Sequence, residues 1–103
     1  MDYTLEQLEE RLGEAAARLL PYLRTSKLID STAMTDLLET ADLIRAKLNE
    51  DDLVPRRLTG TLWFIFTSML TEAGHAHKHS PEPILNAAWS YEERLRKIFG
   101  PKF

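Results

Sequence analysis

Apolar residues recur at steps of three and four along four separate stretches of this chain, and no stretch shows the alternation typical of a strand. A helix built on that spacing carries its apolar side chains on one face, which has to be buried against another helix. The pattern therefore predicts an all-α fold, a compact four-helix bundle. The expected helices cover residues 4–23, 31–48, 55–73 and 81–99. Short connections predict that consecutive helices pack as antiparallel neighbours.

Capping residues mark the starts of the first two expected helices. Thr4 and Gln7 have the spacing of a capping box, and either Asp30 or Ser31 is a suitable N-cap for the second helix. Pro21 lies near the end of the first helix. We expect it to kink or stop that helix, because proline lacks the N–H that a helix interior requires.

Proline and glycine mark the ends of the last two expected helices. Pro55 suits the first position of the third helix and Gly74 suits its C-cap. Ser80 suits the N-cap of the fourth helix, and Pro81 suits its first position. The third helix contains LTGTLWFIFTSML over residues 58–70, which is apolar on nearly all sides. That composition predicts a place at the centre of the bundle.

Three aromatic residues have positions that bear on the core. Tyr22 and Trp89 fall on the apolar stripes of the first and fourth helices, and we expect both to be buried. Phe64 falls on the less apolar arc of the third helix. If that arc is exposed, Phe64 would anchor a partner or a homodimer. We favour the core, because a helix that is apolar nearly all round is expected to be surrounded.

Length and composition predict one domain, residues 1–103, with an apolar fraction of 44%. The chain has no cysteine, which excludes disulfides, thiolate zinc sites and cysteine nucleophiles. Its first residues are acidic where a signal peptide is basic, and its most apolar segment is too short and too polar to cross a bilayer. We expect a cytoplasmic protein that does not bind membranes.

Charge is distributed unevenly along the chain. Residues 1–52 carry 12 acidic and 6 basic side chains, whereas residues 53–103 carry 4 acidic and 7 basic, for an overall net charge of −3. The acidic first half would repel nucleic-acid phosphates, so nucleic acid is not an expected partner. The same acidity suits a basic protein partner, although solvated helix faces carry charge in any case.

All three histidines lie in the segment GHAHKHSPEP, as His75, His77 and His79. Imidazole binds zinc, copper and nickel, so this cluster is the candidate metal site of the chain. One expected helix ends just before the segment and the next begins within it, so no regular element would hold the three rings on one face. No cysteine or further histidine completes a site. We interpret the segment as a connector and expect no metal or cofactor.

No pattern typical of catalysis stands out in the sequence. It has no glycine-rich phosphate loop, and a bundle of this size is expected to leave little room for a pocket. Ser68 or Thr71 could approach His75 as a nucleophile approaches its base. Helical serine and threonine more often bond to a carbonyl one turn earlier. We therefore predict a non-catalytic binding protein and not an enzyme.

Three stretches carry a resemblance to a known family. They are ADLIRAKL at residues 41–48, RLTG at 57–60 and PEPILNAAWSYEERL at 81–95. Over about residues 34–100 the chain resembles the small all-helical immunity proteins that neutralise toxins of the type VI secretion system, particularly toxins that hydrolyse NAD. The resemblance implies a compact bundle that inhibits a cognate antibacterial toxin by occluding its active site.

In that family resemblance, acidic side chains of the first half would meet a basic cleft of the toxin. The acidic residues predicted to do so are Glu39, Asp42, Glu50, Asp51 and Asp52. Phe64 is added as a candidate aromatic anchor. Two alternatives remain open. One is a helical adaptor that homodimerises through the third helix, for which an exposed Trp63, Phe64 or Trp89 would be the sign. The other is a metal-responsive protein built on the histidine cluster.

Overall fold

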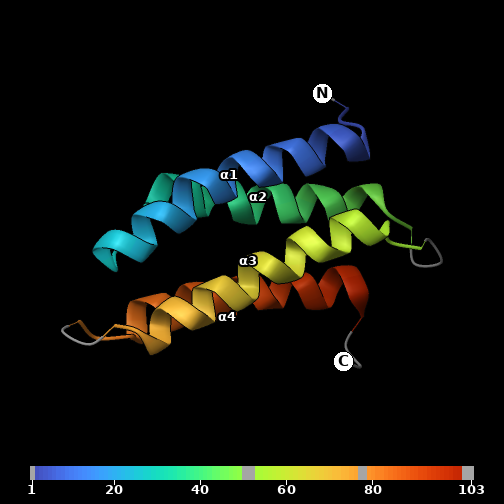
Figure 1. Cartoon of the computed structure of the whole chain (residues 1–103). Coiled ribbons are helices and arrows are strands. Elements are labelled where there is room, and N and C mark those ends of the chain that lie inside the picture. Colours follow the sequence, from blue (N-terminus) through green and yellow to red (C-terminus); the bar gives the residue numbers. More distant parts are fainter. Residues whose placement is uncertain (1, 50–52, 77–78, 101–103) are drawn as a thin grey trace.

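The computed structural model describes three stretches of the chain, residues 2–49, 53–76 and 79–100. Within these stretches the chain forms four α-helices and no strand, and the helices pack into a bundle (Figure 1). They are α1 (Leu5–Ser26), α2 (Ser31–Lys47), α3 (Arg56–Gly74) and α4 (Glu82–Phe99). The predicted all-α four-helix bundle is confirmed. None of the described helices combines the length and the apolarity that a membrane span needs.

The expected caps hold the starts of α1 and α2. Thr4 Oγ1 accepts a hydrogen bond from the Gln7 N–H at 3.1 Å, and the Thr4 N–H donates to Gln7 Oε1 at 2.9 Å. The capping box predicted from the spacing is therefore confirmed. At α2 the N-cap is Asp30, whose Oδ1 accepts from the Ala33 N–H at 3.1 Å.

α1 continues through Pro21 to Ser26, so of the kink or stop expected at this proline, the stop is wrong. Pro21 faces solvent, whereas Leu19 and Leu23 are fully buried. Packing of these leucines stabilises the helix on its inner side, and a backbone carbonyl without its partner on the outer side can bind water. The helix ends at Lys27, which has a φ of 59° and donates its N–H to the Leu23 carbonyl at 2.8 Å.

The ends of α3 and α4 differ from expectation by one residue each. α3 begins at Arg56 and ends at Gly74, one residue later than expected at both ends. α4 begins at Glu82, and Pro81 occupies the N-cap position. Ser80 still acts as a capping residue, because its Oγ accepts a hydrogen bond from the Glu82 N–H at 3.3 Å.

The four helices form two antiparallel pairs that stack on each other. α1 packs on α2, and α3 packs on α4; α1 also contacts α3, and α2 also contacts α4. Figure 1 shows that the helices brought together between the two pairs run in the same direction. α2 and α3 do not contact each other, so the prediction that all consecutive helices are neighbours is wrong for this pair.

The length of the connection allows this diagonal arrangement. Neighbouring helices lie about 8–10 Å apart, which puts diagonal helices of a four-helix bundle about 13 Å apart. The eight residues between α2 and α3 can reach farther than that, since an extended chain spans about 3.3 Å per residue. Like each of the other three helices, α3 packs against two helices and has one side open to solvent, so the prediction of a central, surrounded α3 is wrong.

The core contains the apolar residues that recur at helical spacing on all four helices. Its completely buried members include Leu12, Leu19, Leu37, Ala41, Ile44, Leu62, Ile65, Met69, Ile84, Ala88 and Leu95. Two aromatic residues expected in it are exposed instead, Tyr22 to 45% and Trp89 to 50%. Both lie at the edge of the apolar stripe of their helix, where the neighbouring helix covers a side chain only in part.

Tyr91 is a core residue that the sequence did not indicate. Its side chain is fully buried, and its Oη donates a hydrogen bond to the Leu62 carbonyl at 2.8 Å. Burial raises the pKa of the Tyr91 phenol, because the charged form would lose its hydration. The hydrogen bond joins α4 to the middle of α3 and satisfies the one polar atom of this ring.

Candidate interaction surface on α3

The solvent-facing side of α3 presents a regular row of exposed residues. Gly60, Phe64, Thr67 and Thr71 follow one another at steps of four, three and four, and all four are exposed. We call these four residues the α3 row. Phe64 has 61% of its surface exposed, so the preference for a buried Phe64 is wrong. The arc that carries Phe64 is therefore exposed, and its role as an anchor for a partner or a homodimer stays a prediction.

The geometry of the helix explains why Phe64 is exposed. The buried side of α3 is centred on Leu62, Ile65 and Met69, which contact α1 and α4 from within the bundle. At 100° per residue, Phe64 points more than a quarter turn away from each of Leu62 and Met69. An aromatic side chain on that side has no described helix to cover it, because among the four described helices α3 packs on α1 and α4 alone.

The threonines of the row turn their hydroxyl groups toward their own helix. Thr67 Oγ1 donates to the Phe64 carbonyl at 3.1 Å, and Thr71 Oγ1 donates to the Thr67 carbonyl at 2.9 Å. Beside the row, Thr61 Oγ1 donates to the Arg57 carbonyl at 3.1 Å. These bonds confirm the interpretation that helical threonines bond to the preceding turn. The row can therefore be covered without leaving these donors unpaired.

Ion pairs with α1 lie at both ends of α3, on either side of the row. Near the start of the helix, Arg57 Nε lies 2.9 Å from Glu9 Oε1. Near its end, the Glu72 carboxylate accepts a hydrogen bond from Lys27 Nζ at 2.6 Å and lies 3.7 Å from Arg24 Nε. The fourteen residues between Arg57 and Glu72 include no charged side chain. The row is thus an uncharged surface between two neutralised ends.

Glu72 is the one acidic residue of α3 and is only 8% exposed. The hydrogen bond from Lys27 lowers the pKa of this carboxyl, with further lowering by the charges of Lys27 and Arg24, although desolvation acts in the opposite direction. The sequence signal was the presence of a single acidic residue on the apolar arc of a helix. Its partner could not be read from the sequence, because Lys27 lies 45 positions earlier.

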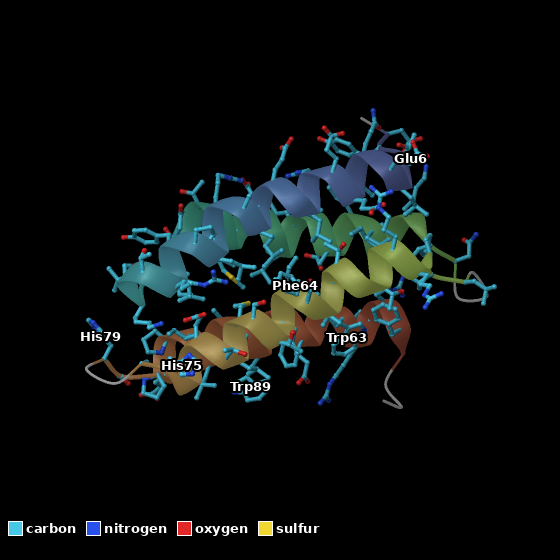
Figure 2. All side chains as sticks on the ribbon, viewed as in Figure 1. Glu6, Trp63, Phe64, His75, His79 and Trp89 are labelled. Atoms are coloured by element: carbon cyan, nitrogen blue, oxygen red, sulfur yellow. The ribbon has the colours of Figure 1, made fainter. Side chains whose placement is uncertain are left out.

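A second group of aromatic rings lies on the other side of α3, along its contact with α4. Trp63 contacts Phe66 and Phe99, each at a ring-centroid distance of 5.9 Å, and Phe66 contacts Trp89 at 6.1 Å. Figure 2 shows Trp63 and Trp89 on the α4 side of α3, and Phe64 on the side nearer α1. Trp89 is the most exposed ring of this group. These rings join two helices, and Phe64 is not one of them.

The predicted acidic contact residues are not assembled around Phe64. Glu39 and Asp42 lie on α2, which does not contact α3. Each carboxylate has an arginine of a neighbouring helix beside it: Arg11 lies 3.6 Å from Glu39, and Arg94 lies 3.6 Å from Asp42. Their charge is therefore partly neutralised within the molecule. The other predicted acidic residues, Glu50, Asp51 and Asp52, lie outside the described residues.

The histidine segment lies between α3 and α4, as the connector interpretation predicted. His75 follows the last residue of α3 and His79 precedes α4, both exposed, while His77 lies outside the described residues. Figure 2 shows His75 and His79 at the same end of the bundle. Over residues 2–49, 53–76 and 79–100, no three His, Cys, Asp or Glu side chains are grouped as they would be around a metal ion.

An open cleft of about 570 Å³ lies between the C-terminal ends of α2 and α4. Its volume is in the usual range for ligand sites, so the expectation that the bundle leaves little room for a pocket is wrong. Leu48 and Phe99 form apolar parts of its wall, and Arg45, Arg96 and Lys97 supply positive charge. Cations at two helix C-termini also offset the negative ends of the helix dipoles, which accounts for them without a ligand.

Comparison of this chain with protein-family models, with curated proteins and with solved structures finds no match. The class of the molecule is therefore given by its fold and its surface. It is an all-α four-helix bundle that exposes one uncharged helix side with an aromatic residue at its centre.

Proposed function

We propose that this chain is a non-catalytic binding protein that acts as an immunity protein and inhibits a cognate antibacterial toxin by covering the toxin's active site. The observation that carries the proposal is the 61% exposure of Phe64 in the middle of the uncharged stretch of α3. A large exposed aromatic residue among small neighbours is the type of side chain that supplies most of the energy of a protein interface. The sequence resemblance supplies the kind of partner.

Inhibition by occlusion needs a rigid surface and no reacting group. The α3 row is held by the core residues beneath it and by the ion pairs of α3 with α1. Little conformational entropy would be lost when a partner covers a side chain on such a helix. The acidic first half of the chain would increase the rate at which a basic toxin surface approaches. The proposal places this protein in the cytoplasm, where NAD would have to be protected.

Growth protection tests the proposal directly. The protein encoded by the adjacent open reading frame would be expressed in a bacterium with and without this chain, and growth and cellular NAD would be measured. We expect the wild-type chain to restore both. Phe64→Glu should abolish protection while retaining the helical circular dichroism of the wild type, because it places a charge at the centre of the contact.

Tyr22→Glu is the matched control, since it introduces the same charge at another exposed aromatic residue, on α1. It should protect as the wild type does. If the wild-type chain fails to protect against the neighbouring gene product, the inhibitor function is wrong. If Phe64→Glu protects fully, the toxin binds elsewhere on the bundle.

The exposure of Phe64 and Trp89 also favours a second candidate function, a helical module that homodimerises. Exposed aromatic residues on α3 or α4 are expected for both candidates, and self-association in solution separates the homodimer from a monomeric inhibitor. The two candidates are compatible, because a small bundle can self-associate when its partner is absent.

A further inference from the structure

The α3 row has the spacing of a coiled-coil seam. Steps of four, three and four place residues along one side of a helix, as the a and d positions of a heptad do. In this row one residue, Phe64, is large, while Gly60, Thr67 and Thr71 are small. Apart from Gly60, its two chain neighbours and the nearby backbone of α3, no described atom lies within 4 Å of the position that a Cβ would take at Gly60, so a second helix could approach there. The row thus combines one large side chain with three small residues.

The row also contains no charged residue, so an identical surface would meet no charge there. Each of the outer sides of α1, α2 and α4 carries exposed charged residues, for example Glu6, Glu10 and Glu14 along α1. In a two-fold contact each protomer presents the same patch to the other, so a row of acidic residues would face a row of the same sign. A chain with a net charge of −3 avoids that repulsion on α3.

We propose that the α3 row binds the α3 row of a second copy of this chain, with the two helices antiparallel about a two-fold axis. The midpoint of the row lies between Phe64 and Thr67, so an antiparallel pairing sets Phe64 of one protomer against Thr67 of its partner. The same pairing sets Gly60 against Thr71. Each phenyl ring then packs on methyl groups, and the threonine hydroxyls keep their bonds to their own helix.

The size of the contact sets its strength. The uncharged part of α3 between Arg57 and Glu72 is about 22 Å long at 1.5 Å per residue. A single helix pair of that length covers less than the roughly 800 Å² per protomer of a standard interface. We therefore expect a reversible dimer with a dissociation constant in the micromolar range. Self-association specifies the contact of the second candidate function and does not depend on the inhibitor function. Competition between a second copy and a toxin for Phe64 does rest on the inhibitor function.

Sedimentation velocity of the isolated chain over a range of concentrations tests the dimer. The mass should rise from 11.9 kDa at low micromolar concentration toward twice that value at several hundred micromolar. Phe64→Glu should remain at 11.9 kDa throughout, and Tyr22→Glu should behave as the wild type. A wild-type mass that stays at 11.9 kDa over the whole range would overturn the proposal, as would self-association of Phe64→Glu equal to that of the wild type.

A mixture of two variants tests the antiparallel register. Phe64→Glu and Thr67→Lys each place like charges near the axis and should dissociate their own dimers. When mixed, they should form a heterodimer, because Glu at position 64 would face Lys at position 67. An associating wild type whose variants do not associate on mixing would refute this register. These outcomes are independent of growth protection: a chain that dimerises without protecting, or protects without dimerising, shows which of the two proposals has failed.

Discussion

Glu72 joins α3 to α1 through a carboxylate that is almost completely removed from solvent. Its hydrogen bond with Lys27 holds the pKa of the carboxyl below its ordinary value of 4.5, and the nearby Arg24 acts in the same direction. The unfolded chain therefore binds a proton at Glu72 more readily than the folded chain does. The resulting stabilisation is present above pH 4.5 and is lost as the pH falls toward the lowered value of the folded state.

We expect Glu72→Gln to remove part of this acid sensitivity. At neutral pH the variant should have a lower free energy of unfolding, by about 1–3 kcal/mol, because Lys27 loses its charged acceptor. Between about pH 5 and pH 3 its stability should fall less steeply than that of the wild type. Urea denaturation at a series of pH values measures both effects. Glu10→Gln, at an exposed residue of α1, should keep the wild-type dependence of stability on pH. If the stability of Glu72→Gln fell as steeply with falling pH as that of Glu10→Gln, Glu72 would not be the source of the acid sensitivity.

Single residues show where sequence reasoning succeeds. The capping box of Thr4 and Gln7 could be predicted, because both partners lie within one turn. The arginines beside Glu39 and Asp42 could not, because they come from helices whose neighbours the sequence does not specify. For Phe64, its angular position on the helix was a better guide than its hydrophobicity. A side chain opposite the core stays exposed unless another element covers it.

At the scale of the helix, α1 tolerates a proline that breaks the rule for helix interiors. Pro21 has no backbone N–H to donate within the last turns of α1, yet the helix extends five residues beyond it. Buried leucines on the inner side and side-chain bonds on the outer side support this end. Thr25 Oγ1 donates to the Pro21 carbonyl at 3.1 Å, and Ser26 Oγ donates to the Tyr22 carbonyl at 2.6 Å. Tertiary packing therefore outweighs the local preference.

Pro21→Ala should stabilise the protein. The alanine N–H can complete a backbone hydrogen bond, and the clash of the proline ring with the preceding turn disappears. The unfolded chain gains some freedom, which offsets part of this benefit. We expect a net increase of about 1–2 kcal/mol in the free energy of unfolding, measured by urea denaturation. Pro55→Ala, at the N-cap of α3, should give no increase. A gain for Pro55→Ala equal to that for Pro21→Ala would show that proline position is irrelevant.

At the scale of the whole molecule, the sequence predicts the helices better than their arrangement. All four stripes pack into one core as expected, since each helix has to bury its apolar side. The diagonal placement of α2 and α3 could not be predicted, because stripes of similar width fit either order around the bundle. That placement decides which two helices cover α3, and so on which side of α3 the uncovered row lies. The candidate surface is therefore a consequence of topology, and from the sequence it could be stated only as a condition on Phe64.

Long-range charge is the remaining property that belongs to the molecule as a whole. If the acidic first half steers a basic toxin, reversing charge near the contact should slow association with little change in dissociation. Asp51→Lys combined with Asp52→Lys changes the net charge from −3 to +1, since each reversal adds two. We expect the association rate with the purified neighbouring toxin domain to fall about tenfold at low salt, and less at physiological ionic strength, where charges are screened.

Glu6→Lys combined with Glu10→Lys makes the same change of net charge on the exposed side of α1. Surface plasmon resonance at two salt concentrations compares the two double variants, and circular dichroism confirms that both keep the bundle. A slower association for the Asp51 and Asp52 variant alone locates the steering charge at these two residues. Equal slowing by both pairs means that net charge acts without a local contact. Unchanged association for the Asp51 and Asp52 variant removes these two residues from the interface, and Phe64 then remains the predicted contact.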